Sequence, residues 1–171
     1  MMKIDVRPGF AMTVALCVLA PAGAAAADEA LSESDRFLLG EAESACRNGD
    51  FPAFLWPFAN SQAVRARYGA SATKDFPIVM IDYSYVTSAS ERLFEAKGGD
   101  PRQLVYVQVD FSAPSSGVER VDWMPGRFEP GEGDGPGTLI ETTGPGGHVT
   151  FRRTGDCWQL TEDIRNPGRV R

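Results

Sequence analysis

Histidine and cysteine are scarce in this chain of 171 residues, which contains one histidine and three cysteines. Protein metal sites are built from clusters of histidine, cysteine and carboxylate ligands, so we predict no metal site. The HExxH pattern of metalloproteases, the GxSxG turn of serine hydrolases and the phosphate-binding P-loop are also absent. We therefore predict no cofactor and assign no catalytic residue from motifs.

Basic residues are also few, with 17 lysines and arginines against 23 acidic residues and a formal net charge of −6. Nucleic acids and anionic lipids are bound by clustered lysine and arginine side chains. Here the basic residues are scattered, apart from the pairs Arg65/Arg67 and Arg152/Arg153. We predict that the protein has no nucleic-acid partner.

A long apolar run occurs at the N-terminus. Lys3 and Arg7 precede the apolar segment FAMTVALCVLA, and PAGAAAA then offers the small residues of a cleavage site before Asp28. This pattern predicts a cleavable signal peptide over residues 1–27 and a single periplasmic or secreted domain over 28–171, with no membrane attachment after cleavage. An uncleaved anchor over residues 10–27 is the alternative, but this run is short for a membrane span and contains a proline.

Two cysteines, Cys46 and Cys157, remain once the signal peptide is removed. A pair of cysteines in a small exported domain is typical of one disulfide, so we predict a Cys46–Cys157 bond. Two buried free thiols are the alternative. Strand alternation that turns Trp158 inward would turn Cys157 outward. The bond therefore requires Cys157 to lie in a turn, or Cys46 to lie near the edge of the sheet.

Residues 32–69 have helical patterns. Ser32 or Ser34 can cap a first helix that ends at Asn48-Gly49, and its apolar stripe consists of Leu38, Ala42, Ala45 and Cys46. Asp50 can cap a second helix, whose stripe consists of Phe51, Phe54, Leu55 and Phe58. We expect Pro57 to end or kink this helix. A third short helix is expected through QAVRARYG.

From residue 77 the patterns are those of strands: PIVMIDYSYV, QLVYVQVDFSA, GVERVDWM, GTLIETT, HVTFRR and CWQLTED. SASERLFEAKGGD, after the first of these, is expected to form a short helix or an ordered loop. The stretch RFEPGEGDGPG is expected to be a mobile hairpin loop. Short connections between the later segments predict an antiparallel meander. Helices followed by strands predict an α+β fold.

The helical start CRNGDFPAFLWPFANSQAVRARYG and the meander that ends in GDCWQLTED resemble the nuclear-transport-factor-two-like superfamily, which includes the SnoaL-like proteins. The resemblance implies N-terminal helices packed on a curved antiparallel sheet of five to six strands, shaped as a cone with a pocket at its open end. Isomerases, dehydratases, polyketide cyclases and proteins that only bind ligands or partners share this fold. The fold therefore does not select a function.

Side-chain alternation along the strands predicts which residues face the core. The inner face should include Val105, Val107, Val109 and Phe111, then Val121, Val149 and Phe151. Asp110 and His148, two obvious general-base candidates, should face away from it. Polar-tipped residues expected to line a pocket are Tyr83, Tyr85, Trp123, Trp158 and, if Leu139 rather than Ile140 faces inward, Glu141.

Three functions follow from these expectations. We favour a protein that binds a small apolar ligand or a protein partner and is not an enzyme. An isomerase or lyase would instead use Glu141 or Asp82 as a base beside Tyr83 or Tyr85. A homodimeric assembly module would use the outer face of the sheet, which is predicted to carry Tyr106, Gln108, Asp122, Thr150 and Gln159.

Overall fold

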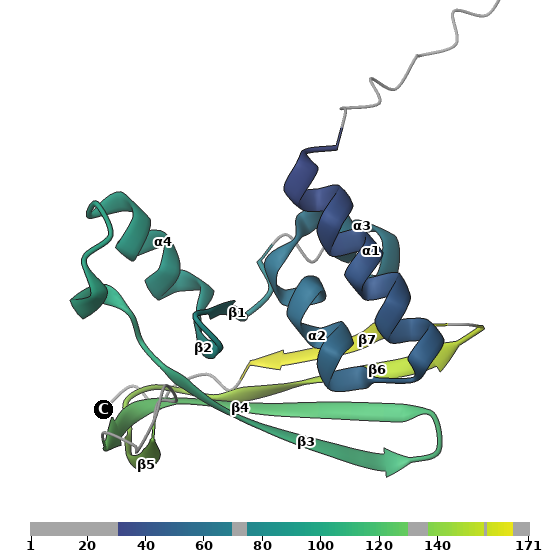
Figure 1. Ribbon diagram of the computed structural model, residues 1–171. Coiled ribbons are helices and arrows are strands. Elements are labelled where there is room, and N and C mark those ends of the chain that lie inside the picture. The colour runs from purple at the N-terminus through teal and green to yellow at the C-terminus, as the bar shows by residue number, and fades with distance from the viewer. Residues whose placement is uncertain (1–30, 70–74, 130–136, 156, 166–171) are drawn as a thin grey trace, which may run out of the picture. The chain divides into compact units, whose positions relative to one another are not determined.

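The computed structural model describes residues 31–69, 75–129, 137–155 and 157–165 (Figure 1). The predicted signal peptide and most of the predicted loop RFEPGEGDGPG lie outside these residues. Within the described ranges, no helix combines the length and the apolar character needed to cross a membrane.

Three helices form the first part of the described chain: α1 (Glu33–Asn48), α2 (Phe51–Asn60) and α3 (Gln62–Tyr68). The predicted start and end signals are confirmed, since Ser32 caps α1, Asp50 caps α2 and Gly49 ends α1 with a φ of 68°. Ser61 caps α3. Helix α2 continues past Pro57 to Asn60, so this proline does not end the helix. Both predicted apolar stripes are buried.

Asp35 connects the first helix to the start of the third. Its carboxylate accepts hydrogen bonds from the hydroxyl groups of Ser61 and Ser32, both at 2.7 Å. These two bonds lower the pKa of Asp35 below its usual value, and the bond from Ser61 has the larger effect. Ser61 is almost completely buried, so its hydrogen bond to Asp35 also satisfies a polar group inside the helical layer.

We expect Asp35→Asn to make stability less sensitive to acid. A carboxyl group with a lowered folded-state pKa stabilises the fold above its unfolded-state pKa, and this contribution is lost as the pH falls through the folded-state value. The variant should be less stable than the wild type at neutral pH and should lose less unfolding free energy between roughly pH 4 and roughly pH 2. Urea unfolding at several pH values in this range measures the slope of the unfolding free energy against pH. The exposed Asp110→Asn is the control, and equal slopes for wild type and Asp35→Asn would contradict the prediction.

The segment predicted as one strand over residues 77–86 is a tight hairpin, which corrects that prediction. Strands β1 (Ile78–Ile81) and β2 (Ser84–Thr87) pair antiparallel, and Asp82 and Tyr83 form the two-residue turn between them. Both turn residues have positive φ angles, 45° and 63°, as two-residue turns of type I′ require. The next elements are α4 (Ser88–Ala96), which confirms the predicted short helix, and the 3₁₀ turn η1 (Pro101–Gln103).

The main sheet is antiparallel and contains β3 (Val107–Ser115), β4 (Val118–Glu129), β5 (Thr138–Thr142), β6 (Gly147–Thr154) and β7 (Cys157–Arg165). Its order is β3-β4-β6-β7, and β5 pairs with the far end of β4. The α+β fold class is therefore confirmed, whereas the meander is confirmed only for the hairpins β3-β4, β4-β5 and β6-β7, because β6 pairs with β4 and not with β5. In the first predicted strand of the meander the inward positions are buried only in part, since Val107 is buried whereas Val105 and Phe111 are exposed.

The hydrophobic core lies between the helices and the face of the sheet formed by β4, β6 and β7 (Figure 1). Aromatic rings fill its centre: Phe54 lies 5.4 Å from Trp158, and Phe58 lies 5.0 Å from Phe151, between ring centroids. Val121 and Val149 face this core, while Asp122 and His148 face outward, as strand alternation predicted.

The predicted disulfide is present: Cys46 and Cys157 are bonded, with their Cα atoms 4.8 Å apart. Cys46 lies in the last turn of α1, and Cys157 is the first residue of β7, where it pairs with Thr154 at the end of β6. Cys157 can therefore reach Cys46 without facing inward as Trp158 does, because the start of β7 lies beside the end of α1.

Candidate functional site

The predicted pocket residues do not form one site. Tyr83 lies in the β1–β2 turn and is 93% exposed, so the prediction that it faces inward is wrong. Tyr85 packs against the core, and burial raises the pKa of its hydroxyl group. Trp158 is part of the aromatic core and Trp123 is buried, so the inward direction predicted for both tryptophans is confirmed.

The predicted pair of a buried carboxylate and a tyrosine is not formed. Glu141 is exposed and its carboxylate lies 2.8 Å from the guanidinium group of Arg127. A register shift between β4 and β5 leaves Ile140 without a partner, and Leu139 is the less exposed of the two apolar residues. Asp82 is exposed in the hairpin turn. Neither carboxylate therefore has the buried position that the isomerase hypothesis requires.

The outer face of the sheet carries the predicted polar residues. His148 lies 3.3 Å from the carboxylate of Glu162 on this face, and Asp110 is exposed. The residues predicted for a partner surface are exposed or half-buried: Tyr106, Gln108, Asp122, Thr150 and Gln159. A homodimer through this face stays a prediction.

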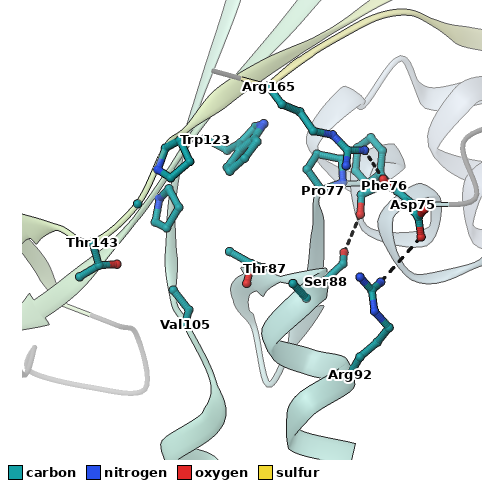
Figure 2. Close-up of a pocket in the computed structure, with 14 residues that line it drawn as sticks. Asp75, Phe76, Pro77, Thr87, Ser88, Arg92, Val105, Trp123, Thr143 and Arg165 are labelled. Carbon is teal, nitrogen blue, oxygen red and sulfur yellow. Dashed lines mark hydrogen bonds and ion pairs between the residues drawn. The ribbon is translucent and has the colours of Figure 1, made fainter. Parts of the chain in front are cut away.

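A cavity of about 420 Å³ lies where the β1–β2 hairpin, helix α4 and the main sheet meet (Figure 2). This volume is within the range of small-molecule sites. Apolar side chains make up much of its wall: Phe76, Pro77, Val105, Trp123, Pro125 and Pro145. The charged residues that line it are Asp75, Arg92 and Arg165.

The charged side of the cavity is held by a few polar contacts (Figure 2). The hydroxyl group of Ser88, the first residue of α4, donates to the carbonyl oxygen of Phe76 at 2.6 Å. The guanidinium group of Arg165 donates to the carbonyl oxygen of Asp75 and to the carboxylate of Asp163. Arg92 lies 3.9 Å from the carboxylate of Asp75. These contacts connect the segment before β1 to the end of β7.

Trp123 contributes both apolar surface and an unsatisfied donor. The residue is 8% exposed, and its indole Nε1 has no hydrogen-bond partner in the described part of the chain. The ring passes close to the backbone at Gly147, where an added Cβ atom would come within 2.9 Å of it. The absence of a side chain at this position thus leaves room for the indole beside the cavity.

The sequence predicts Trp123 and Val105 on the inner face but not the other residues of the cavity. Most of these lie outside regular strands, in the segment before β1, in α4, and in the connection Thr143–Pro145 between β5 and β6. Strand alternation gives no information about such segments. The prolines Pro125 and Pro145, the second of them directly before Gly146-Gly147, were the available sequence signal of a rigid wall.

Comparison with family models found no match, and no curated protein matches the chain. Among solved structures, the chain is similar to an NTF-2 like protein of unknown function from Shewanella oneidensis MR-1, determined as a crystal structure at 1.70 Å. The match covers 77% of this chain and 95% of that chain, with 16% sequence identity and a TM-score of 0.23. Because the TM-score is low, we draw no conclusion about the fold or the cavity from this similarity.

Proposed function

We propose that the protein is an exported domain that binds a small, largely apolar molecule in the cavity beside Trp123. The observation that carries this proposal is the cavity itself, with an apolar wall and a few polar groups on one side. That combination is typical of small-molecule sites, in which apolar surface provides affinity and sparse polar groups fix the orientation of the ligand. The guanidinium group of Arg92 is one such polar group.

Binding is better supported than catalysis by the residues that line the cavity. General acid–base chemistry needs a titratable group, most often an imidazole or a carboxylate, within hydrogen-bond reach of the substrate. Among the described residues that line the cavity, Asp75 is the carboxylate, and its side chain is 77% exposed and paired with Arg92. The enzyme hypothesis uses Glu141 or Asp82 with Tyr83 or Tyr85, and none of these four residues lines the cavity.

Export is proposed from the N-terminal pattern and is supported by the disulfide. Disulfides between structural cysteines persist in oxidising compartments such as the periplasm and the extracellular space. The Cys46–Cys157 bond is compatible with that location. Mass spectrometry of the protein recovered from periplasm and medium should find Asp28 as the first residue, and a mature chain that still begins at Met1 would contradict export by cleavage.

The cavity is tested with octanol as a neutral apolar probe and intrinsic tryptophan fluorescence as the signal. We expect octanol to change the emission of the wild type and of Trp56→Phe, but to change the emission of Trp123→Phe much less, because Trp123 lines the cavity and Trp56 does not. Trp56→Phe is the matched control, since it removes one indole that packs against the core but does not line the cavity. An equal response in Trp123→Phe, or no response in the wild type, would contradict the proposal.

A further inference from the structure

We propose that the ligand of this cavity is an amphipathic monocarboxylate, with its carboxylate bound by Arg92 and its apolar body against Trp123. This inference rests on the proposed function, because it assigns the chemistry of a ligand in the same cavity. It is carried by the distribution of polar groups around the cavity. Figure 2 shows Arg92 and Asp75 at one side, and Val105 and Thr143 at the other.

Arg92 has hydrogen-bonding capacity to bind an anion. Its closest acidic partner is Asp75, and the distance of 3.9 Å between nitrogen and oxygen is too long for a hydrogen bond. No hydrogen bond from its guanidinium group to another described residue is formed. A guanidinium group offers a planar set of donors that matches a carboxylate in a bidentate arrangement. An exposed ion pair at this distance contributes little, so a ligand carboxylate can compete with Asp75.

Arg165, the other cation of the cavity, is already engaged. Its Nε and Nη2 atoms donate to the carboxylate of Asp163 at 3.2 Å and 2.8 Å, and Nη2 also donates to the carbonyl oxygen of Asp75. Asp163 neutralises the charge of Arg165. The bond to the carbonyl oxygen of Asp75 holds the cavity wall in place. Of the two arginines, Arg92 is therefore the one that can take up a ligand carboxylate.

The opposite part of the cavity favours an apolar group. Trp123 and Val105 present apolar surface there, together with the rings of Pro125 and Pro145. Proline rings and an indole ring lose little conformational freedom on binding, so they form a preorganised wall. A ligand with a single charge at one end and a hydrocarbon or aromatic body at the other fits both sides of the cavity at once.

A series of three probes of equal chain length separates the charge from the apolar body: octanoate, octanol and octylammonium. Binding to the full mature protein is measured by calorimetry at low ionic strength. We expect octanoate to bind about tenfold more tightly than octanol, and octylammonium to bind more weakly than octanol. Arg92→Met keeps an apolar stem but removes the charge, so it should reduce octanoate affinity to the level of octanol and leave octanol affinity unchanged.

Arg102→Met is the matched control, because it removes the same charge from an exposed arginine of η1 that does not line the cavity. Octanoate affinity should be unchanged in this variant. Equal affinities of the wild type for octanoate and octanol would overturn the assignment of a carboxylate while the proposed binding function stands. Equal losses of octanoate affinity in Arg92→Met and Arg102→Met would also overturn it. Failure of all three probes to bind would overturn the binding function as well.

Discussion

Replacement of both bonded cysteines by alanine is expected to lower the free energy of unfolding by about 2–5 kcal/mol. The bond connects residues separated by 111 positions in the sequence, so it restricts the unfolded chain strongly. The chain-entropy model gives about 4–5 kcal/mol for a loop of this length. Since small domains are stable by about 5–15 kcal/mol in total, this loss is a large part of the whole. Urea unfolding of the wild type and of the double variant measures the difference.

Wild-type protein unfolded in the presence of a strong reductant is the control for this experiment. It should match the double alanine variant, because both lack the bond but keep the other contacts of the core. Alanine is used because Cys46 is buried, where a hydroxyl group would need a hydrogen-bond partner. Labelling of both sulfurs in the unreduced protein, or an unchanged unfolding midpoint in the double variant, would show that the bond does not form or does not stabilise the fold.

Phe54→Ala is expected to destabilise the protein by about 3–5 kcal/mol, the usual cost of removing a phenylalanine ring from a core. The Phe54 side chain is completely buried. Its ring centroid lies 5.7 Å or less from those of Phe58, Tyr68 and Trp158, so the helical layer and β7 both contact it. Removal of the ring leaves a cavity between α2, α3 and the sheet. Chemical denaturation monitored by far-ultraviolet circular dichroism measures the loss.

Phe37→Ala provides the comparison for Phe54→Ala. The two variants lose the same atoms, but Phe37 is 57% exposed on α1 and contacts Trp56 at its edge. We expect it to cost less than half as much as Phe54→Ala, because most of its apolar surface is already in water. Similar losses in the two variants would mean that Phe54 is not at the centre of the core.

The helical half of the fold was predictable in detail because its signals are local. A capping side chain lies within three residues of the amide group that it accepts from, and an apolar stripe repeats every turn. Asp50 and Gly49 therefore indicated helix ends before any tertiary contact was known, and Ser32 was one of two candidate caps for α1. The burial of Phe54 and Phe58 followed from the same periodicity.

The β1–β2 hairpin could not be predicted because its turn lacks the usual residues. Two-residue hairpin turns favour Asn-Gly or Asp-Gly, since both central residues need positive φ angles. Here Tyr83 occupies the second position at 63°. Within the run IVMIDYSYV, it was therefore assigned to a strand. This single error turned Tyr83 toward the core in the prediction and placed Asp82 beside it.

The candidate site was predictable only where it includes a regular strand. Trp123 follows from alternation along β4, whereas Asp75 and Arg92 come together with it only because the hairpin and α4 fold over the end of the sheet. Such contacts join segments that are distant in sequence. Glu141 shows a further difficulty. Leu139 and Ile140 are equally apolar, so the sequence does not reveal the register shift between β4 and β5.

The bond between α1 and β7 also makes most of the protein a covalent ring. All elements from α2 to β6 lie between its two sulfur atoms. If a protease cuts the backbone once between Cys46 and Cys157, the two fragments stay attached to each other and separate only on reduction. The N-terminal fragment then retains α1 and the C-terminal fragment retains β7, so neither can diffuse away from its partner. Outside the cytoplasm, where proteases are common and resynthesis is impossible, such a ring keeps a nicked molecule in one piece.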